Sequence, residues 1–172
     1  MHVIASPEEI GDLEVADPER VAYLTQTTLA VDDTAAVVER LRERFPALVG
    51  PASSDICYAT QNRQDAVRAL AAECDIVVVV GSSNSSNSRR LVEVSERAGC
   101  PALLVEGGRE IPPQLLRDAR RVGLTAGASA PEELVEAVIR AVEGLGSVTI
   151  AERTVAEEDI RFRLPREVRP AR

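Results

Sequence analysis

A run of seven small polar residues, Ser82–Ser88, follows the apolar segment Ile76–Val80 after a single glycine. Hydroxyl and amide groups of this size can donate hydrogen bonds to an anion without steric conflict. If a helix begins within the run, its N-terminus adds unpaired N–H groups and the positive end of the helix dipole. The run therefore predicts a phosphate site, with Ser85, Ser86 and Asn87 as donors. The alternative is a plain N-capping loop, which explains one serine but not the whole run.

A second segment, Thr125–Pro131, repeats this arrangement, because small residues follow an apolar run and Ser129 precedes a helical pattern. Ligands of open α/β sheets bind at the carboxyl ends of strands. If the two runs are neighbouring strands, both polar segments face one anion. Ser129 as a simple helix-capping residue remains an equal alternative from the sequence.

Cys57 stands at the start of a helical pattern, where the helix dipole lowers a thiol pKa and favours metal ligation or redox chemistry. The alternative is a small buried apolar residue, which is the commoner role of a lone cysteine. Cys74 and Cys100 stand at the ends of helical patterns, and we expect both to be structural. The only histidine is His2, and the sequence has no CxxC or HExxH motif, so we expect no complete metal site.

Short β-branched runs alternate with longer helical patterns, which is typical of parallel βαβ units and predicts the α/β class. The expected strands are Val3–Ala5, Val21–Thr25, Asp75–Val80, Ala102–Val105 and Val122–Ala126. The expected helices are Asp33–Phe45, Tyr58–Glu73, one from the polar run to Ala98, a short one at Pro112–Pro113, and Pro131–Glu143.

Three further local features are expected. Ser6 and Glu9 have the spacing of a capping box around Pro7. The turn-rich segment Pro51–Asp55 predicts a lobe boundary. The apolar run Val148–Ile150 and the alternating Ile160–Leu164 predict an edge strand and an arm.

Composition limits the classes of function. The net charge of −8 argues against a nucleic-acid surface, which needs clustered positive charge. The longest apolar run is too short to cross a bilayer, and no secretory signal opens the chain. Three cysteines without repeated spacing are no disulfide framework, so we expect a cytoplasmic protein.

Four segments resemble, in order, motifs of the 4-hydroxy-3-methylbut-2-enyl diphosphate reductases, the LytB family. These segments are Leu24–Leu29 (LTQTTL), Asp55–Gln64 (DICYATQNRQ), Gly81–Ser88 (GSSNSSNS) and Thr125–Pro131 (TAGASAP). The resemblance implies a trefoil of three parallel-sheet α/β lobes around a 4Fe–4S cluster. It also implies reductive dehydroxylation of an allylic diphosphate to isopentenyl and dimethylallyl diphosphates, with electrons from a ferredoxin- or flavodoxin-type donor.

The resemblance assigns roles to single residues. It implies that Cys57 is the third cluster ligand and that Thr27 lies beside the substrate hydroxyl. The diphosphate ligands that it implies are Ser85, Ser86, Asn87 and Ser129.

The resemblance also divides the chain. Residues 1–53 correspond to the end of the second lobe, residues 54–146 to the third lobe, and residues 147–172 to a tail. The family's first lobe, two cysteine ligands, substrate-binding histidines and glutamate proton donor have no counterpart here, so we expect this chain to be inactive alone. The alternative is a naturally short, non-catalytic phosphate-binding module or split subunit.

Overall fold

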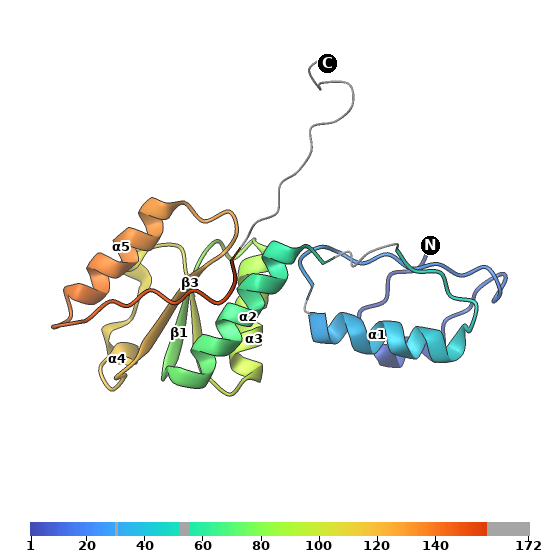
Figure 1. Ribbon diagram of the computed structural model, residues 1–172, viewed down its shortest axis with the longest axis horizontal. Coiled ribbons are helices and arrows are strands. Elements are labelled where there is room, and N and C mark those ends of the chain that lie inside the picture. The colour runs from blue at the N-terminus through green and yellow to red at the C-terminus, as the bar shows by residue number, and fades with distance from the viewer. Residues whose placement is uncertain (30, 52–55, 158–172) are drawn as a thin grey trace, which may run out of the picture.

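A three-stranded parallel sheet with helices on both faces forms the main body of the protein (Figure 1). The computed structural model describes residues 1–29, 31–51 and 56–157. The strands are β1 (Ile76–Val80), β2 (Ala102–Val105) and β3 (Val122–Ala126), in the order β2-β1-β3. The helices are α1 (Val31–Arg44), α2 (Tyr58–Glu73), α3 (Ser86–Arg97), α4 (Pro113–Leu116) and α5 (Glu132–Glu143), with 3-10 turns η1 (Pro7–Ile10) and η2 (Gly108–Glu110). The predicted α/β class is confirmed.

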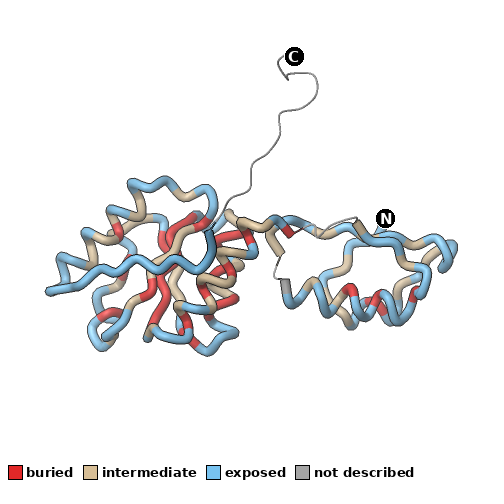
Figure 2. The backbone as a smooth tube through the Cα atoms, in the orientation of Figure 1, coloured by how far each residue is buried: buried red, intermediate tan, exposed pale blue. Residues whose placement is uncertain are grey.

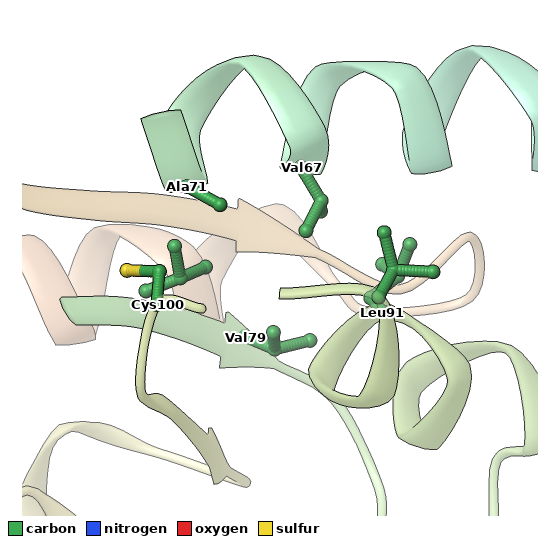
Figure 3. Close-up of a cluster of buried hydrophobic side chains, with 7 residues drawn as sticks. Val67, Ala71, Val79, Leu91 and Cys100 are labelled. Carbon is green, nitrogen blue, oxygen red and sulfur yellow. The ribbon is translucent and has the colours of Figure 1, made fainter. Parts of the chain in front are cut away.

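Strand β1 is buried on both faces because its side chains alternate between two hydrophobic clusters. Val77 and Val79 pack with α2 and α3, and Figure 3 shows this cluster with Val67 and Leu91. The other residues of β1 point to the opposite face of the sheet. That face is covered by α5 and by Leu116, which belongs to α4. Burial is accordingly densest along the sheet (Figure 2). The valine run of the sequence is therefore explained by a central strand covered on both faces.

The segment before α2 has a small core of its own, built around Ile10, Leu41 and Phe45. α1 contributes Leu41 to this core through the helical spacing expected from the sequence, and Phe45 follows directly after the helix. The predicted strand Val3–Ala5 is wrong, since those residues form no regular structure. The predicted strand Val21–Thr25 is reduced to one parallel bridge between Ala22 and Val49.

Ion pairs at the start of α1 connect this segment to α2 and α3. Asp32 pairs with Arg68 of α2 at 2.8 Å, and Asp33 pairs with Arg97 of α3 at 2.8 Å. The predicted lobe boundary at residues 51–55 falls largely on residues outside the described ranges, so the lobe assignment stays a prediction.

Of two local predictions at chain ends, one is half right and the other is wrong. Ser6 is the N-cap of η1 and Pro7 follows it, as predicted. No capping box forms, because the Ser6 side chain makes no cap hydrogen bond and Glu9 accepts from the N–H of Ala5 at 3.3 Å. Val148–Ile150 forms no strand but part of an extended strap, which Arg153 attaches to Glu73 of α2. A cleft of about 1470 Å³ lies between this strap and β3, so the run does not pair with the free edge of β3. Ile160–Leu164 lies outside the described residues.

No helix in the described part of the chain is both long enough and apolar enough to cross a membrane.

Replacing Leu91 by alanine tests the packing of α2 and α3 on one face of the sheet. Leu91 is fully buried between α3, α2 and β1, so Leu91→Ala should lower the free energy of unfolding by about 2–5 kcal/mol. Leu115→Ala is the control, because Leu115 is 50% exposed and its loss should change stability by less than about 0.5 kcal/mol. Urea denaturation followed by circular dichroism measures both, and equal effects of the two variants would contradict this packing.

Candidate anion-binding loops and cysteine ligand

The two polar loops predicted from the sequence follow adjacent strands and lie at the same edge of the sheet. β1 and β3 are parallel neighbours, so their carboxyl ends meet there (Figure 1). The N–H of Gly127, after β3, donates to the carbonyl of Val80 at 2.8 Å, and the N–H of Gly81 donates to Val105 at 2.9 Å. Main-chain hydrogen bonds therefore connect the starts of both loops to the sheet.

The polar residues at the start of α3 occupy three different environments. Ser85 is the N-cap, and its hydroxyl accepts a hydrogen bond from the N–H of Ser88 at 3.2 Å, so the capping alternative holds for this one serine. Ser86 is exposed. Asn87 is only 7% exposed, and both its amide oxygen and its amide nitrogen are buried without a hydrogen-bond partner among the described residues.

Ser129 does not cap α5. The N-cap of that helix is Pro131, and no side chain caps it. Ser129 is exposed on the loop after β3. The capping alternative is therefore wrong for this residue, and its hydroxyl is not used by the helix.

Hydrogen bonds to Glu106, which the sequence analysis missed, hold the outer part of the loop after β1 in place. Glu106, after β2, accepts hydrogen bonds from the N–H of Ser83 at 3.0 Å and from its hydroxyl at 3.3 Å. These bonds, the backbone one most strongly, lower the pKa of Glu106. Because Ser83 is paired in this way, its N–H and hydroxyl are already used within the protein. The polar run in the sequence could have suggested a partner at the end of the neighbouring strand.

Cys57 is the N-cap of α2, as predicted, and its thiol is exposed. Its sulfur lies 3.0 Å from the hydroxyl of Thr60 and accepts the N–H of Thr60 at 3.4 Å. The hydrogen bond with the Thr60 hydroxyl is the main cause that lowers the pKa of Cys57, against partial desolvation, and the charge of Arg63 contributes in the same direction. The sequence analysis missed Thr60, although its spacing of three from a helix N-cap is the usual capping spacing.

The other two cysteines lie at the opposite end of α2. Cys74 is the C-cap of that helix, and the Cys100 thiol donates to its carbonyl at 3.3 Å. Burial raises the pKa of Cys74. A helix of 16 residues is about 24 Å long, so neither thiol shares a site with Cys57. In the described part of the chain, no three His, Cys, Asp or Glu residues gather closely enough to hold a metal ion.

Thr27 lies on an exposed turn, as the sequence predicts. The side-chain amide of Gln64, buried in α2, donates to the carbonyl of Leu29 at 2.9 Å and attaches this turn to the helix that begins after Cys57.

The hydrogen bond between Thr60 and Cys57 makes a prediction about pH dependence. Thr60→Val should raise the pKa of the Cys57 thiol, because it removes the hydroxyl that favours the thiolate. The pH–rate profile for alkylation of Cys57 by iodoacetamide should therefore move to higher pH, with slower reaction at neutral pH. Thr60→Ser, which keeps the hydroxyl, is the control. An unchanged profile in Thr60→Val, measured by mass spectrometry of the labelled peptide, would contradict the role of Thr60.

Comparison with known proteins identifies the family. Residues 1–143 match the family model described as LytB protein. The 4-hydroxy-3-methylbut-2-enyl diphosphate reductase of Bordetella pertussis is 54% identical over 96% of this chain and 51% of that protein. The reductase 1 of Mycobacterium tuberculosis is 50% identical over 97% of this chain and 51% of that protein. This chain thus spans about half the length of the curated relatives that it matches.

The fold agrees with that identification. The solved E-1-hydroxy-2-methyl-but-2-enyl-4-diphosphate reductase from Plasmodium falciparum superimposes with a TM-score of 0.76 at 35% identity, over 81% of this chain and 44% of that one. Because the family model covers 143 of the 172 residues and the sheet matches part of a solved reductase, this chain belongs to the LytB protein family.

Proposed function

We propose that this chain supplies the diphosphate-binding loops and one cluster-ligating thiolate of a 4-hydroxy-3-methylbut-2-enyl diphosphate reductase. The observation that carries the proposal is the amide of Asn87, which is buried and unpaired in the first turn of α3. Family membership supports the reaction class, since the relatives that match over most of this chain carry that name.

Burying an amide group without a hydrogen-bond partner lowers the stability of the folded protein. Leaving a buried donor or acceptor without a partner costs about 1–3 kcal/mol, and buried polar groups in folded proteins are rarely left so. A bound diphosphate oxygen accepts from the amide nitrogen, and an ordered water or a ligand hydroxyl can donate to the oxygen. The cost is thus recovered when an anion binds, so this amide is suited to hold one.

The neighbouring groups suit the same anion. The N-terminal N–H groups of α3 and the hydroxyls of Ser86 and Ser129 are donors, and all of them follow strands that end at one edge of the sheet. The Ser85 hydroxyl can still donate its proton, because its cap bond uses it as an acceptor. Thr27 then serves as the group beside the substrate hydroxyl, to which it can pass a proton.

Cys57 fits one corner of an iron–sulfur cluster. Its thiol is exposed, stands at a helix N-terminus and has a lowered pKa, which are the properties of a metal-ligating thiolate. A 4Fe–4S cluster held by three such thiolates supplies electrons and a Lewis-acidic iron. The net reaction takes two electrons, from a ferredoxin- or flavodoxin-type donor, and two protons. It breaks the allylic C–O bond and releases water, leaving isopentenyl or dimethylallyl diphosphate.

The described residues provide one ligand of the three, so a complete cluster needs cysteines from outside them. We therefore expect the 172-residue chain by itself to bind diphosphate without turning it over. The competing function, a short phosphate-binding module without a redox role, shares the anion loops but needs no thiolate at Cys57.

Inorganic diphosphate binding tests the anion site directly. Asn87→Ala should weaken binding by about 10- to 100-fold, because one hydrogen bond to a charged group is worth about 1.5–3 kcal/mol. Asn84→Ala is the matched control, since Asn84 is an exposed asparagine in the same loop and should leave the affinity unchanged. Isothermal titration calorimetry measures both, and an Asn87→Ala variant that binds as tightly as the unmodified chain would refute the site.

Iron loading tests the role of Cys57. The chain is joined to the amino-terminal part of the Bordetella pertussis reductase that it does not cover, and the fusion is reconstituted anaerobically. Cys57→Ser should lose iron, visible absorption and turnover, whereas Cys74→Ser and Cys100→Ser should keep all three.

Two results would contradict this assignment. One is equal iron content and turnover in Cys57→Ser and the unmodified fusion, which would favour the non-redox module. The other is turnover by the isolated 172-residue chain, which would show that it completes the site by another route.

A further inference from the structure

Ser88 occupies the space between the two polar loops, one after β1 beginning at Gly81 and one after β3 beginning at Gly127. It is only 1% exposed, and it lies in the first turn of α3. A Cβ atom placed on Gly81 would lie 2.8 Å from the Cβ of Ser88, and one placed on Gly127 would lie 3.4 Å from it. Either added atom would also overlap the Ser88 hydroxyl. The side chain of Ser88 therefore contacts the main chain of the loops after β1 and after β3 at once.

The same residue is connected to the helix cap. The N–H of Ser88 donates to the hydroxyl of Ser85, so the first turn of α3, the cap and both glycines meet at one side chain. Glycine at positions 81 and 127 is explained by this close approach, since neither has a positive φ. A smaller residue at position 88 leaves a void between the loops, and a larger one forces them apart.

We infer that Ser88 is a positioning residue for the anion site: its buried side chain sets the separation of the two loops, so that Ser129 and the first turn of α3 reach the same anion. This inference rests on the proposed diphosphate site. Ser88 is not counted among the ligands, because its hydroxyl packs against Gly81 and Gly127, and it acts through those two residues.

A role in packing alone is the competing explanation, and the chain offers a control for it. Ser95 lies in the same helix and is also fully buried, and its hydroxyl donates to the carbonyl of Cys100 at 3.0 Å. It lies near the C-terminus of α3, away from the loops. Ser95→Ala and Ser88→Ala should both lower stability, but only Ser88→Ala should change the anion site.

The geometry also predicts which glycine variant can be rescued. Gly127→Ala should weaken binding of inorganic diphosphate by about tenfold or more, equivalent to losing about one hydrogen bond. Adding Ser88→Ala removes the hydroxyl that the new methyl group overlaps and leaves an ordinary 3.4 Å contact, so the double variant should recover affinity. Gly81→Ala should not be rescued, because its methyl group still lies 2.8 Å from the Cβ at position 88.

The experiment uses the 172-residue chain and two readouts, at a temperature where every variant is folded. Calorimetry gives the affinity for inorganic diphosphate, and hydrogen exchange gives the protection of the Gly127 N–H, which is bonded to Val80. We expect Ser88→Ala to lose about tenfold in affinity and much of that protection, with Ser95→Ala unchanged in both.

The outcomes separate the two proposals. Unchanged affinity and protection in Ser88→Ala, or rescue of both glycine variants, overturns the positioning role. If the unmodified chain binds no diphosphate, the proposed function fails, and hydrogen exchange at Gly127 still decides whether Ser88 sets the position of the loop. Should Ser88→Ala fail to fold, Gly127→Ala alone decides the question, because unchanged affinity and an unchanged loop in that variant would overturn the positioning role.

Discussion

Strand β1 has no face that water reaches, and the α/β body is arranged around that constraint. A strand buried in this way needs hydrogen-bonding partners at both edges and helices over both faces. Both neighbours are parallel to it, so each connection returns through a helix and the loops that follow the strands meet at one edge. The two polar loops are therefore close to each other because β1 and β3 are parallel neighbours, not because the loops attract one another.

That edge gathers donors for negative charge in a chain whose net charge is −8. The overall charge has little effect at the site, because charges farther away than about 8 Å are screened at physiological ionic strength. What matters is local: the N–H groups of the first turn of α3, the serine hydroxyls, and an amide at Asn87 that has no other partner. Glu106 adds a negative charge nearby, but its hydrogen bonds hold the outer loop in place.

Features set by local sequence could be predicted, and those set by distant partners could not. The helix Tyr58–Glu73 and the strand Val122–Ala126 have the predicted bounds, because their periodicity and their stop signals lie within a few residues. The strand expected at Val148–Ile150 fails because a cleft separates this run from the edge strand β3, and that separation is set by distant packing. The motif match pointed to Asn87, but neither its unpaired amide nor the contact of Ser88 with two glycines can be read from the sequence, since both depend on how the first turn of α3 packs against β1 and the loop after β3.

The positions of α2 and α3 relate the cysteine to the anion loops. Both helices run antiparallel to β1 and pack beside each other, so their N-termini point to the same end of the body (Figure 1). One N-terminus stabilises the thiolate of Cys57 and the other favours an anion near Asn87, because each is the positive end of a helix dipole. Under the proposed function, this packing of α2 and α3 places both negatively charged groups at that end, because a helix packed the opposite way would present the negative end of its dipole to one of them.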